Sequence, residues 1–402
     1  MAKQGRAGPA LGIAALGSFI AGTFAVIGLM LLAPTLARFA VKFGPAEYFS
    51  LMVLGLSILA YLSHGSLLKA LIMACFGLIL GLVGLDSISA VPRLTFDRME
   101  LVDGVGLVPI VMGLFGVAEI LVNLERRVTR ELFAQRIRGL MPSRQDWKES
   151  AGPLVRGSLL GFVLGILPGG GAVIASFIAY AVEKRVSKTP ERFGKGAIAG
   201  VAGPEAANNA AAGSGFIPLL TLGIPPNVVL ALLLGAFIVH GLQPGPLLMV
   251  QNPNIFWGIV ASMYIGNVML LILNLPLIGM WVQVLKVPYK ILFPLILLFC
   301  LIGVYSIGNS IFDIYVMIVF GVLGYLMRKF GYEPAPLVLA FVLGPMMENN
   351  LRKALILSEG SFATFIERPI SLACLTLAVL LLGSALVPIW RARRAKIALE
   401  TS

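Results

Sequence analysis

Two stretches interrupt apolar runs near their middle: Gly165-Ile166-Leu167-Pro168-Gly169-Gly170-Gly171 and Leu222-Gly223-Ile224-Pro225-Pro226-Asn227. Glycine and proline break the helical ladder there and free backbone N–H and C=O groups. Each unsatisfied group costs several kcal/mol in hydrocarbon, so a broken helix persists at membrane depth only where protein or a water-filled cavity satisfies it. Two such breaks close together indicate a transport site.

The composition is that of an integral membrane protein. Of the 402 residues, 58% are hydrophobic and only 12% are charged, whereas about a quarter of the residues in soluble domains are charged. The length suffices for about ten spans of roughly 20 residues each and leaves no room for a separate soluble domain. We predict an all-α, polytopic fold with about nine to ten spanning helices plus one or two re-entrant or broken helical hairpins.

The apolar runs divide the chain into four parts of one permease domain, residues 1–402. These parts are N-terminal spans (1–124), a basic cytoplasmic loop (125–150), a core of discontinuous helices (151–250) and C-terminal spans (251–402). The predicted spans are 11–33, 48–62, 67–85, 105–124, 255–282, 291–306, 311–327, 336–347 and 370–389.

The net charge of +12 is explained by topology. Lysine and arginine are concentrated in short inter-span segments, in the loop 125–149 and in the tail 391–396, and cytoplasmic segments collect these residues. We therefore expect these basic residues to lie beside the lipid bilayer, and we expect no nucleic acid partner.

The run 154–182 is flanked by basic segments on both sides, although a single crossing would place one of them outside. As one helix it would measure about 43 Å, well above a core of about 30 Å, whereas two legs of about 13 residues reach only roughly 20 Å each. We predict a re-entrant hairpin with its tip at Pro168, Gly169, Gly170 and Gly171. The stretch Gly223 to Asn227 forms a second discontinuous element.

The tip glycines can leave backbone amides free at the start of the next helix, and such an N-terminus attracts carboxylates. Between the breaks, a segment of small residues carries Glu205, Asn208 and Asn209, whose oxygens and amides suit a cation or a substrate carboxylate. We take Glu205 and Asn208 as candidate cation ligands. Asn227 is a preferred type of N-cap for the helix that follows.

Two plainer interpretations stay open. The breaks could be glycine-rich kinks that only let helices pack, because glycine and proline are common in membrane helices. The segment around Glu205 could be a polar loop at the membrane surface. Elsewhere, Glu119 and Asp313 lie within apolar runs, where an ionisable group is a functional candidate by default.

Motifs for soluble enzymatic chemistry do not occur in usable context. Gly169 to Gly171 follow no strand and lack a downstream acidic residue, and no P-loop, zincin motif or Ser-His-Asp order is present. We expect no enzymatic activity, no metal and no cofactor. One alternative remains, a membrane-embedded enzyme such as a lipid phosphatase with glycine-rich re-entrant loops.

At these residues the chain resembles the large permease subunit of the tripartite tricarboxylate transporter family. The similar motifs are Leu167-Pro168-Gly169-Gly170-Gly171, Phe177-Ile178-Ala179-Tyr180, Phe193-Gly194-Lys195-Gly196, Pro204-Glu205-Ala206-Ala207-Asn208-Asn209-Ala210, Leu222-Gly223-Ile224-Pro225, His240-Gly241-Leu242-Gln243-Pro244-Gly245-Pro246, Gly84-Leu85-Asp86, Pro92-Arg93-Leu94-Thr95-Phe96 and Leu343-Gly344-Pro345-Met346-Met347-Glu348-Asn349-Asn350.

The resemblance implies a secondary transporter in the bacterial inner membrane that imports small di- and tricarboxylates by symport with Na⁺ or H⁺. It also implies two partners, a small membrane subunit and a periplasmic solute-binding protein. The positions that match the family pattern and would line the substrate route are Pro168, Gly169, Gly170, Gly171, Asn208, Asn209, Gly223, Pro225 and Asn227.

The chain departs from the family pattern in two places. Pro226 stands where many members have glycine, which removes an amide donor and stiffens the turn. The sequence also begins at the methionine of an Asp-Gly-Tyr-Pro-Met stretch that in the family follows another Leu-Pro-Gly break. Because this sequence lacks that break, we keep one alternative open: a truncated product that is a non-transporting remnant or scaffold.

Overall fold

The computed structural model describes residues 1, 4–62, 66–86, 88–126, 139–168, 171–284 and 287–400. Helices make up most of this part of the chain. Two short strands, β1 (Gly84–Leu85) and β2 (Pro92–Arg93), pair antiparallel, with Gly84 opposite Arg93. The prediction of an all-α fold is confirmed.

Six of the described helices are long and apolar enough to cross a membrane: Ala7–Ala40, Pro45–Leu62, Leu107–Glu125, Pro253–Asn274, Lys290–Gly308 and Ile311–Lys329. Three shorter apolar helices join them, Leu67–Gly81, Val228–Val239 and Pro369–Ser384. The chain is therefore a multi-pass membrane protein, as predicted.

The chain forms two compact units. The first unit, Met1–Val41 and Thr129–Leu292, contains both helix breaks. Its helices are α1 (Ala7–Ala40), α6 (Arg144–Ile166), α7 (Ala172–Val186), α8 (Ala199–Ser214), α9 (Phe216–Leu222), α10 (Val228–Val239), α11 (Leu248–Gln251), α12 (Pro253–Asn274) and α13 (Ile278–Val284). Whether the two units make one permease domain stays a prediction.

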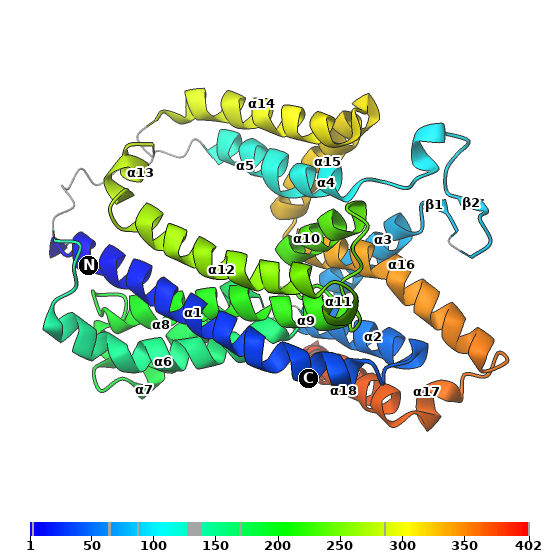
Figure 1. The fold of residues 1–402 in the computed structure, drawn as a ribbon, viewed down its shortest axis with the longest axis horizontal. Coiled ribbons are helices and arrows are strands. Elements are labelled where there is room, and N and C mark those ends of the chain that lie inside the picture. Colours follow the sequence, from blue (N-terminus) through cyan, green and yellow to red (C-terminus); the bar gives the residue numbers. More distant parts are fainter. Residues whose placement is uncertain are drawn as a thin grey trace. The chain divides into compact units, whose positions relative to one another are not determined.

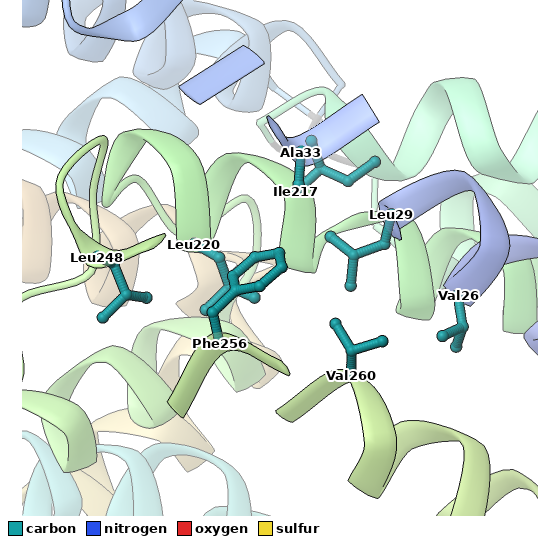
Figure 2. Packing of buried hydrophobic residues seen from close by; sticks show 8 residues of the cluster. All are labelled: Val26, Leu29, Ala33, Ile217, Leu220, Leu248, Phe256 and Val260. Atoms are coloured by element: carbon teal, nitrogen blue, oxygen red, sulfur yellow. The ribbon is translucent and has the colours of Figure 1, made fainter. Parts of the chain in front are cut away.

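In the first unit, α8 packs against α1, α6 and α7, and α12 packs along α1 (Figure 1). An apolar cluster joins α1, α9, α11 and α12, and Figure 2 shows the fully buried ring of Phe256 beside Leu220. Leu29 and Ile217 of the same cluster are also fully buried. This buried apolar cluster therefore holds α9, the helix before the second break, against α1.

The second unit, Lys42–Val128 and Phe293–Ser402, consists mainly of paired helices. In it, α16 packs on α3 and α2, α18 packs on α2, and α15 packs on α4, α5 and the π-helical turn between them, Met112–Val117. Its helices are α2 (Pro45–Leu62), α3 (Leu67–Gly81), α4 (Leu107–Val111), α5 (Ala118–Arg126), α14 (Tyr289–Gly308), α15 (Ile311–Lys329), α16 (Pro334–Leu357), α17 (Thr364–Glu367) and α18 (Pro369–Glu400).

Three predicted spans differ from the structure. The span 67–85 is shorter than predicted, because α3 ends at Gly81 and Gly84–Leu85 form β1. The span 255–282 is broken, because α12 ends at Asn274 and α13 begins at Ile278. Pro276 between them has no N–H to donate and its ring clashes with the preceding turn. The short span 336–347 belongs to the longer helix α16, whose polar second half carries Glu348 and Arg352 in ion pairs.

Candidate functional site

The first helix break lies where the sequence predicts it. Helix α6 ends at Ile166, Leu167 is extended, and α7 begins at Ala172. A residue before proline is driven toward extended conformations, which accounts for Leu167. Gly171 has φ +40°, a value that favours glycine. Pro168 is half-buried, and Gly169 and Gly170 lie outside the described residues.

The two legs of this break fold back on each other. Arg156 of α6 donates to Glu183 of α7 through Nε at 2.8 Å and through Nη2 at 2.6 Å. The two residues lie at matching distances from the turn, so α6 and α7 are antiparallel. This confirms a helical hairpin. The partial membrane crossing that makes a hairpin re-entrant stays a prediction.

The first leg is longer than predicted, because α6 begins at Arg144 rather than near Leu154. Ser143 and Asp146 form a reciprocal capping box there, with the Ser143 N–H donating to Asp146 at 3.0 Å and the Asp146 N–H donating to Ser143 at 3.2 Å. Such a cap satisfies backbone N–H groups at a helix start. The polar residues after it therefore extend the helix.

The small-residue segment between the breaks is helix α8, so the interpretation as a surface loop is wrong. Gly157, Gly161 and Gly165 of α6 face Gly203, Ala207 and Ala211 of α8, and a methyl group on any of the three glycines would overlap a backbone oxygen of α8. Small residues at every fourth position let two helix backbones approach closely. The matching order of these pairs shows that α6 and α8 run parallel.

The second break is held by backbone contacts. Gly223 has φ +73°, and the backbone N–H groups of Gly223 and Ile224 donate to Leu219 and Pro218 at 3.0 and 3.3 Å. This arrangement closes the end of α9 in the manner of a glycine C-cap. A Cβ on Gly223 would lie 2.5 Å from the Pro244 carbonyl oxygen.

The residues after Gly223 are also ordered by local contacts. Pro225 and Pro226 are buried. Asn227 accepts a hydrogen bond from the Leu230 N–H at 3.0 Å and thereby caps α10, so the predicted capping role is confirmed. Capping uses only the side-chain oxygen of Asn227, so it does not occupy the side-chain N–H groups.

The helices that lead into the two breaks reach the same apolar cluster. Ile166, the last residue of α6, packs against the cluster that contains Ile217 and Leu220 of α9. Figure 2 shows Ile217 and Leu220 in that cluster. Two breaks far apart in the sequence are thus anchored on one buried group of side chains.

The polar residues of α8 point to different neighbours. Glu205 accepts a hydrogen bond from the Ser18 hydroxyl of α1 at 2.9 Å, and Asn209 donates to Ser18 Oγ at 2.8 Å. Asn208 instead donates to Ser176 of α7 at 3.3 Å. The structure therefore joins Glu205 with Asn209 and separates Asn208 from both.

The polar group on α8 and the first break occupy different levels along α6. Glu205 lies level with the middle of α6, between Gly157 and Gly161, and the turn after Ile166 lies roughly 13 Å farther along that helix. Among the described residues, no hydrogen bond connects Glu205, Asn208 or Asn209 with Gly171, Gly223, Pro225 or Asn227. A route that joins Glu205 to the first break would extend over about this length.

Four polar residues near this site were not predicted: Ser18 and Thr23 of α1, Ser176 of α7 and Asn267 of α12. Asn267 donates to the Phe19 carbonyl and to the Thr23 hydroxyl, both at 2.9 Å. A single asparagine inside an apolar run of spanning length is the signal that could have found it. Ser18 carries no comparable signal.

A second polar group lies in the second unit, at the motifs around Asp86, Arg93 and Glu348. Arg93 donates to both oxygens of Glu348 at 2.7 and 3.1 Å, and Arg352 donates to Asp86 at 2.6 Å. The backbone N–H groups of Ser89 and Ile88 and the Arg352 side chain hold the pKa of Asp86 well below its usual range. These contacts attach the β1–β2 hairpin to α16.

Glu119 and Asp313, the two acidic residues within predicted apolar runs, differ in their surroundings. Glu119 is paired with Arg328 and also accepts from Asn123 at 2.9 Å. Asp313 lies in the first turn of α15 and is half-buried. Within the described part of the chain, no three His, Cys, Asp or Glu side chains gather where they could hold a metal ion.

Comparison with known proteins gives one consistent result. The sequence model of the tripartite tricarboxylate transporter TctA family matches residues 1–339. An Agrobacterium vitis protein described as an uncharacterized 52.8 kDa protein in the TAR-I ttuC' 3'region is 52% identical over 400 residues, which is 100% of this chain and 80% of that protein. A second A. vitis protein, described as an uncharacterized protein in the TAR-II ttuC' 3'region, is 55% identical over 240 residues, 60% of this chain and 99% of that protein. No solved structure matches the chain.

Proposed function

Because this chain belongs to the tripartite tricarboxylate transporter TctA family, we propose that it is the permease subunit of a binding-protein-dependent secondary transporter. It imports small di- and tricarboxylates by symport with a cation, Na⁺ or H⁺, and uses no other cofactor. It resides in the bacterial inner membrane. The family match and the apolar helices support this proposal.

One observation carries the proposal: two helix breaks lie in one compact unit, and the helices leading into them share one buried apolar cluster. In secondary transporters, paired discontinuous helices form the binding site, with half-helix N-termini directed at anionic groups of the substrate. The start of α7 at Gly171 and the capped start of α10 at Asn227 are the two helix ends that we propose for this role.

The substrate route in this proposal has two parts. Pro168, Gly169, Gly170 and Gly171 with Gly223, Pro225 and Asn227 offer backbone groups at the breaks, and Asn208 and Asn209 continue the route along α8. The hydrogen bond of Gly223 to Leu219 and the burial of Pro225 support a role for these two residues in shaping the turn. The amide of Asn208 is the more direct candidate for touching substrate.

Two partner proteins complete the system, a small membrane subunit and a periplasmic solute-binding protein that delivers the carboxylate. Family membership supports both. A membrane-embedded enzyme is not favoured, because the described residues of the two breaks carry no nucleophile together with an acid and a base. The alternative is a non-transporting remnant or scaffold. Only a measurement of carboxylate uptake distinguishes it from a permease.

The test is uptake into proteoliposomes that contain the chain and its small membrane subunit. Radiolabelled di- and tricarboxylates are added with the solute-binding protein, under an inward Na⁺ gradient, an inward H⁺ gradient or neither. We expect uptake that requires the binding protein and one of the two gradients, and that an ionophore for that cation abolishes. Uptake that persists without any gradient contradicts symport, and a folded chain without uptake supports a remnant.

A further inference from the structure

The helical hairpin of α6 and α7 has one packed face and one exposed face. Both of its legs pack on α8 (Figure 1), with the small glycines of α6 and the fully buried Ala175 and Ala179 of α7 turned toward that helix. The other face of α6 presents Val155, Leu159 and Val163, which are 61%, 52% and 60% exposed. Side chains four residues apart share a helix face, so these three form one apolar stripe.

Each exposed face runs into a lysine at the same end of the hairpin. Seven residues make nearly two helical turns and eleven make nearly three, so Lys148 lies on the Val155 face of α6 and Lys184 lies on the Val173 face of α7. Val173 is 61% exposed, and both lysines are exposed. Lys188, just beyond the end of α7, is exposed as well. A lysine at the end of an apolar face can keep its stem in lipid while its ammonium group reaches the headgroups.

The uncharged part of the hairpin has the length of one leaflet. The ion pair of Arg156 with Glu183 marks the level where charged residues stop, because residues 157–166 and 172–182 carry no charge. From Arg156 to Ile166, the last residue of α6, the helix rises about 15 Å. This is half of a hydrocarbon core of about 30 Å. The hairpin therefore fits a single leaflet, entered from the end that carries the lysines.

The acids at this end are engaged by arginines and leave the lysines available. Asp146, Glu149 and Glu183 are each paired with an arginine. Within the described part of the first unit, no ion pair includes any of the three lysines. Glu191 is an exposed acid in the segment after α7, and Arg185 adds a further exposed base. This end of the hairpin therefore carries a net positive charge beside the membrane.

We infer that Lys148, Lys184 and Lys188, together called the hairpin base, bind the headgroup of an anionic phospholipid whose acyl chains lie along the exposed faces of α6 and α7. The cytoplasmic leaflet is the one that collects basic residues, and its anionic lipids attract each lysine near its surface. The inference rests on the location of the chain in a membrane and not on what the chain transports. Headgroup binding holds the base at the surface and leaves the glycine-rich tip within the bilayer.

The experiment titrates the purified chain, in an uncharged detergent, with phosphatidylglycerol that carries a fluorescent label on one acyl chain. We expect saturable binding that weakens as NaCl is raised, because salt screens the attraction. The triple variant Lys148→Gln, Lys184→Gln, Lys188→Gln loses about fivefold in affinity for each charge removed. Replacement of the same lysines by arginine keeps the charge and retains the binding.

A matched control removes the same charge elsewhere. Lys42, Arg98 and Lys353 are exposed bases outside the hairpin, and their joint replacement by glutamine leaves the affinity for phosphatidylglycerol at the wild-type value. Melting temperatures in the uncharged detergent check that both triple variants are folded. Equal losses of affinity in the two variants would reduce the effect to net charge and overturn the site. Unchanged affinity in the hairpin-base variant overturns it as well.

A competition measurement separates a lipid from a free anion. Glycerol phosphate is an anionic phosphate ester without acyl chains, so it cannot use the apolar faces. We expect unlabelled phosphatidylglycerol to displace the labelled lipid and glycerol phosphate at the same concentration to leave it bound. Equal displacement by both would make the hairpin base a site for a soluble anion and overturn the lipid site.

A fluorescence measurement tests whether lipid or protein covers the apolar stripe. Val163→Trp places an indole on the exposed face of α6, and Gln145→Trp places one at the exposed polar start of the same helix. In bilayers with phosphatidylcholine brominated on its acyl chains, we expect strong quenching of the fluorescence that Val163→Trp adds to the wild type, and weak quenching for Gln145→Trp. Equally weak quenching in both would show that protein covers the stripe, and the lipid site would fall.

Discussion

Arg156 and Glu183 form a two-pronged ion pair across the α6–α7 hairpin, and the two side chains differ sharply in exposure. The Arg156 side chain is 42% exposed, whereas that of Glu183 is 2% exposed. The cost of breaking the pair therefore depends on which partner is removed.

The first prediction follows from this asymmetry. Arg156→Ala leaves the buried Glu183 carboxylate uncompensated and costs about 2 to 3 kcal/mol, below the range for a fully buried pair because Arg156 is half-exposed. Glu183→Gln leaves only a half-exposed arginine and costs about 1 kcal/mol. Melting temperatures of the purified variants should rank wild type, Glu183→Gln, Arg156→Ala. Equal losses would mean that the burial of Glu183 does not set the cost of breaking the pair.

The close approach of α6 and α8 gives a second prediction. A methyl group on Gly161 would overlap the Ala207 backbone oxygen, so Gly161→Ala forces the two helices apart and costs about 1 to 3 kcal/mol. The control is Gly258→Ala on α12, where nothing lies within 4 Å of the added Cβ. We expect lower folded yield in size-exclusion chromatography for the first variant alone. Similar yields for both would argue against the tight interface.

The second break gives a third prediction. Gly223→Ala places a side chain both at φ +73° and against the Pro244 carbonyl, whereas Gly241→Ala meets only the backbone strain of φ +72° in open space. The strain costs each variant about 1 to 2 kcal/mol, and the overlap adds about 1 to 3 kcal/mol for Gly223. Melting temperature and carboxylate uptake should both fall further in Gly223→Ala. Equal effects would leave strain as the whole cause.

The fourth prediction concerns pH and Asp86. Its pKa is lowered from the usual 3.8, so the folded state favours the ionised form. The stabilisation is fully present above about pH 4 and is lost as the pH falls from there through the lower folded-state pKa. We expect Asp86→Asn to melt at a lower temperature than wild type at pH 7, and the difference to shrink below pH 4.

The control for Asp86 is Asp97→Asn, an exposed residue in the same loop segment. Its melting temperature should follow that of the wild type across the whole range. A difference between wild type and Asp86→Asn that does not change between pH 7 and pH 3 would contradict a role for the Asp86 charge.

The sequence was a good guide wherever the signal is local. Gly171 and Gly223 lie at the predicted breaks because glycine and proline interrupt a helix through their own backbone geometry. Asn227 caps α10 because an N-cap bonds only to the next turn. The start of α6 was missed because the Ser143–Asp146 box lies outside the apolar run that was used to place the helix.

Pairings between distant segments could not be predicted. Ser18 meets Glu205 only because α1 and α8 pack together, and no pattern in either segment names the other. Asn208 and Asn209 are neighbours in the chain but lie about 100° apart around a helix, so one faces α7 and the other α1. Only the rotation of α8 about its own axis shows which of the two asparagines lies beside Ser18 and Glu205.

By itself, the sequence determined that this is an all-α protein with many membrane spans, where two helices break, and to which family the motifs are similar. Composition and local backbone chemistry suffice for each of these. The tertiary structure alone decided that α6 and α7 fold back through Arg156 and Glu183, and that Glu205 has Ser18 and Asn209 beside it. The reason is physical: the close packing of small residues fixes which faces of the helices meet, and that choice belongs to the whole unit rather than to any one segment.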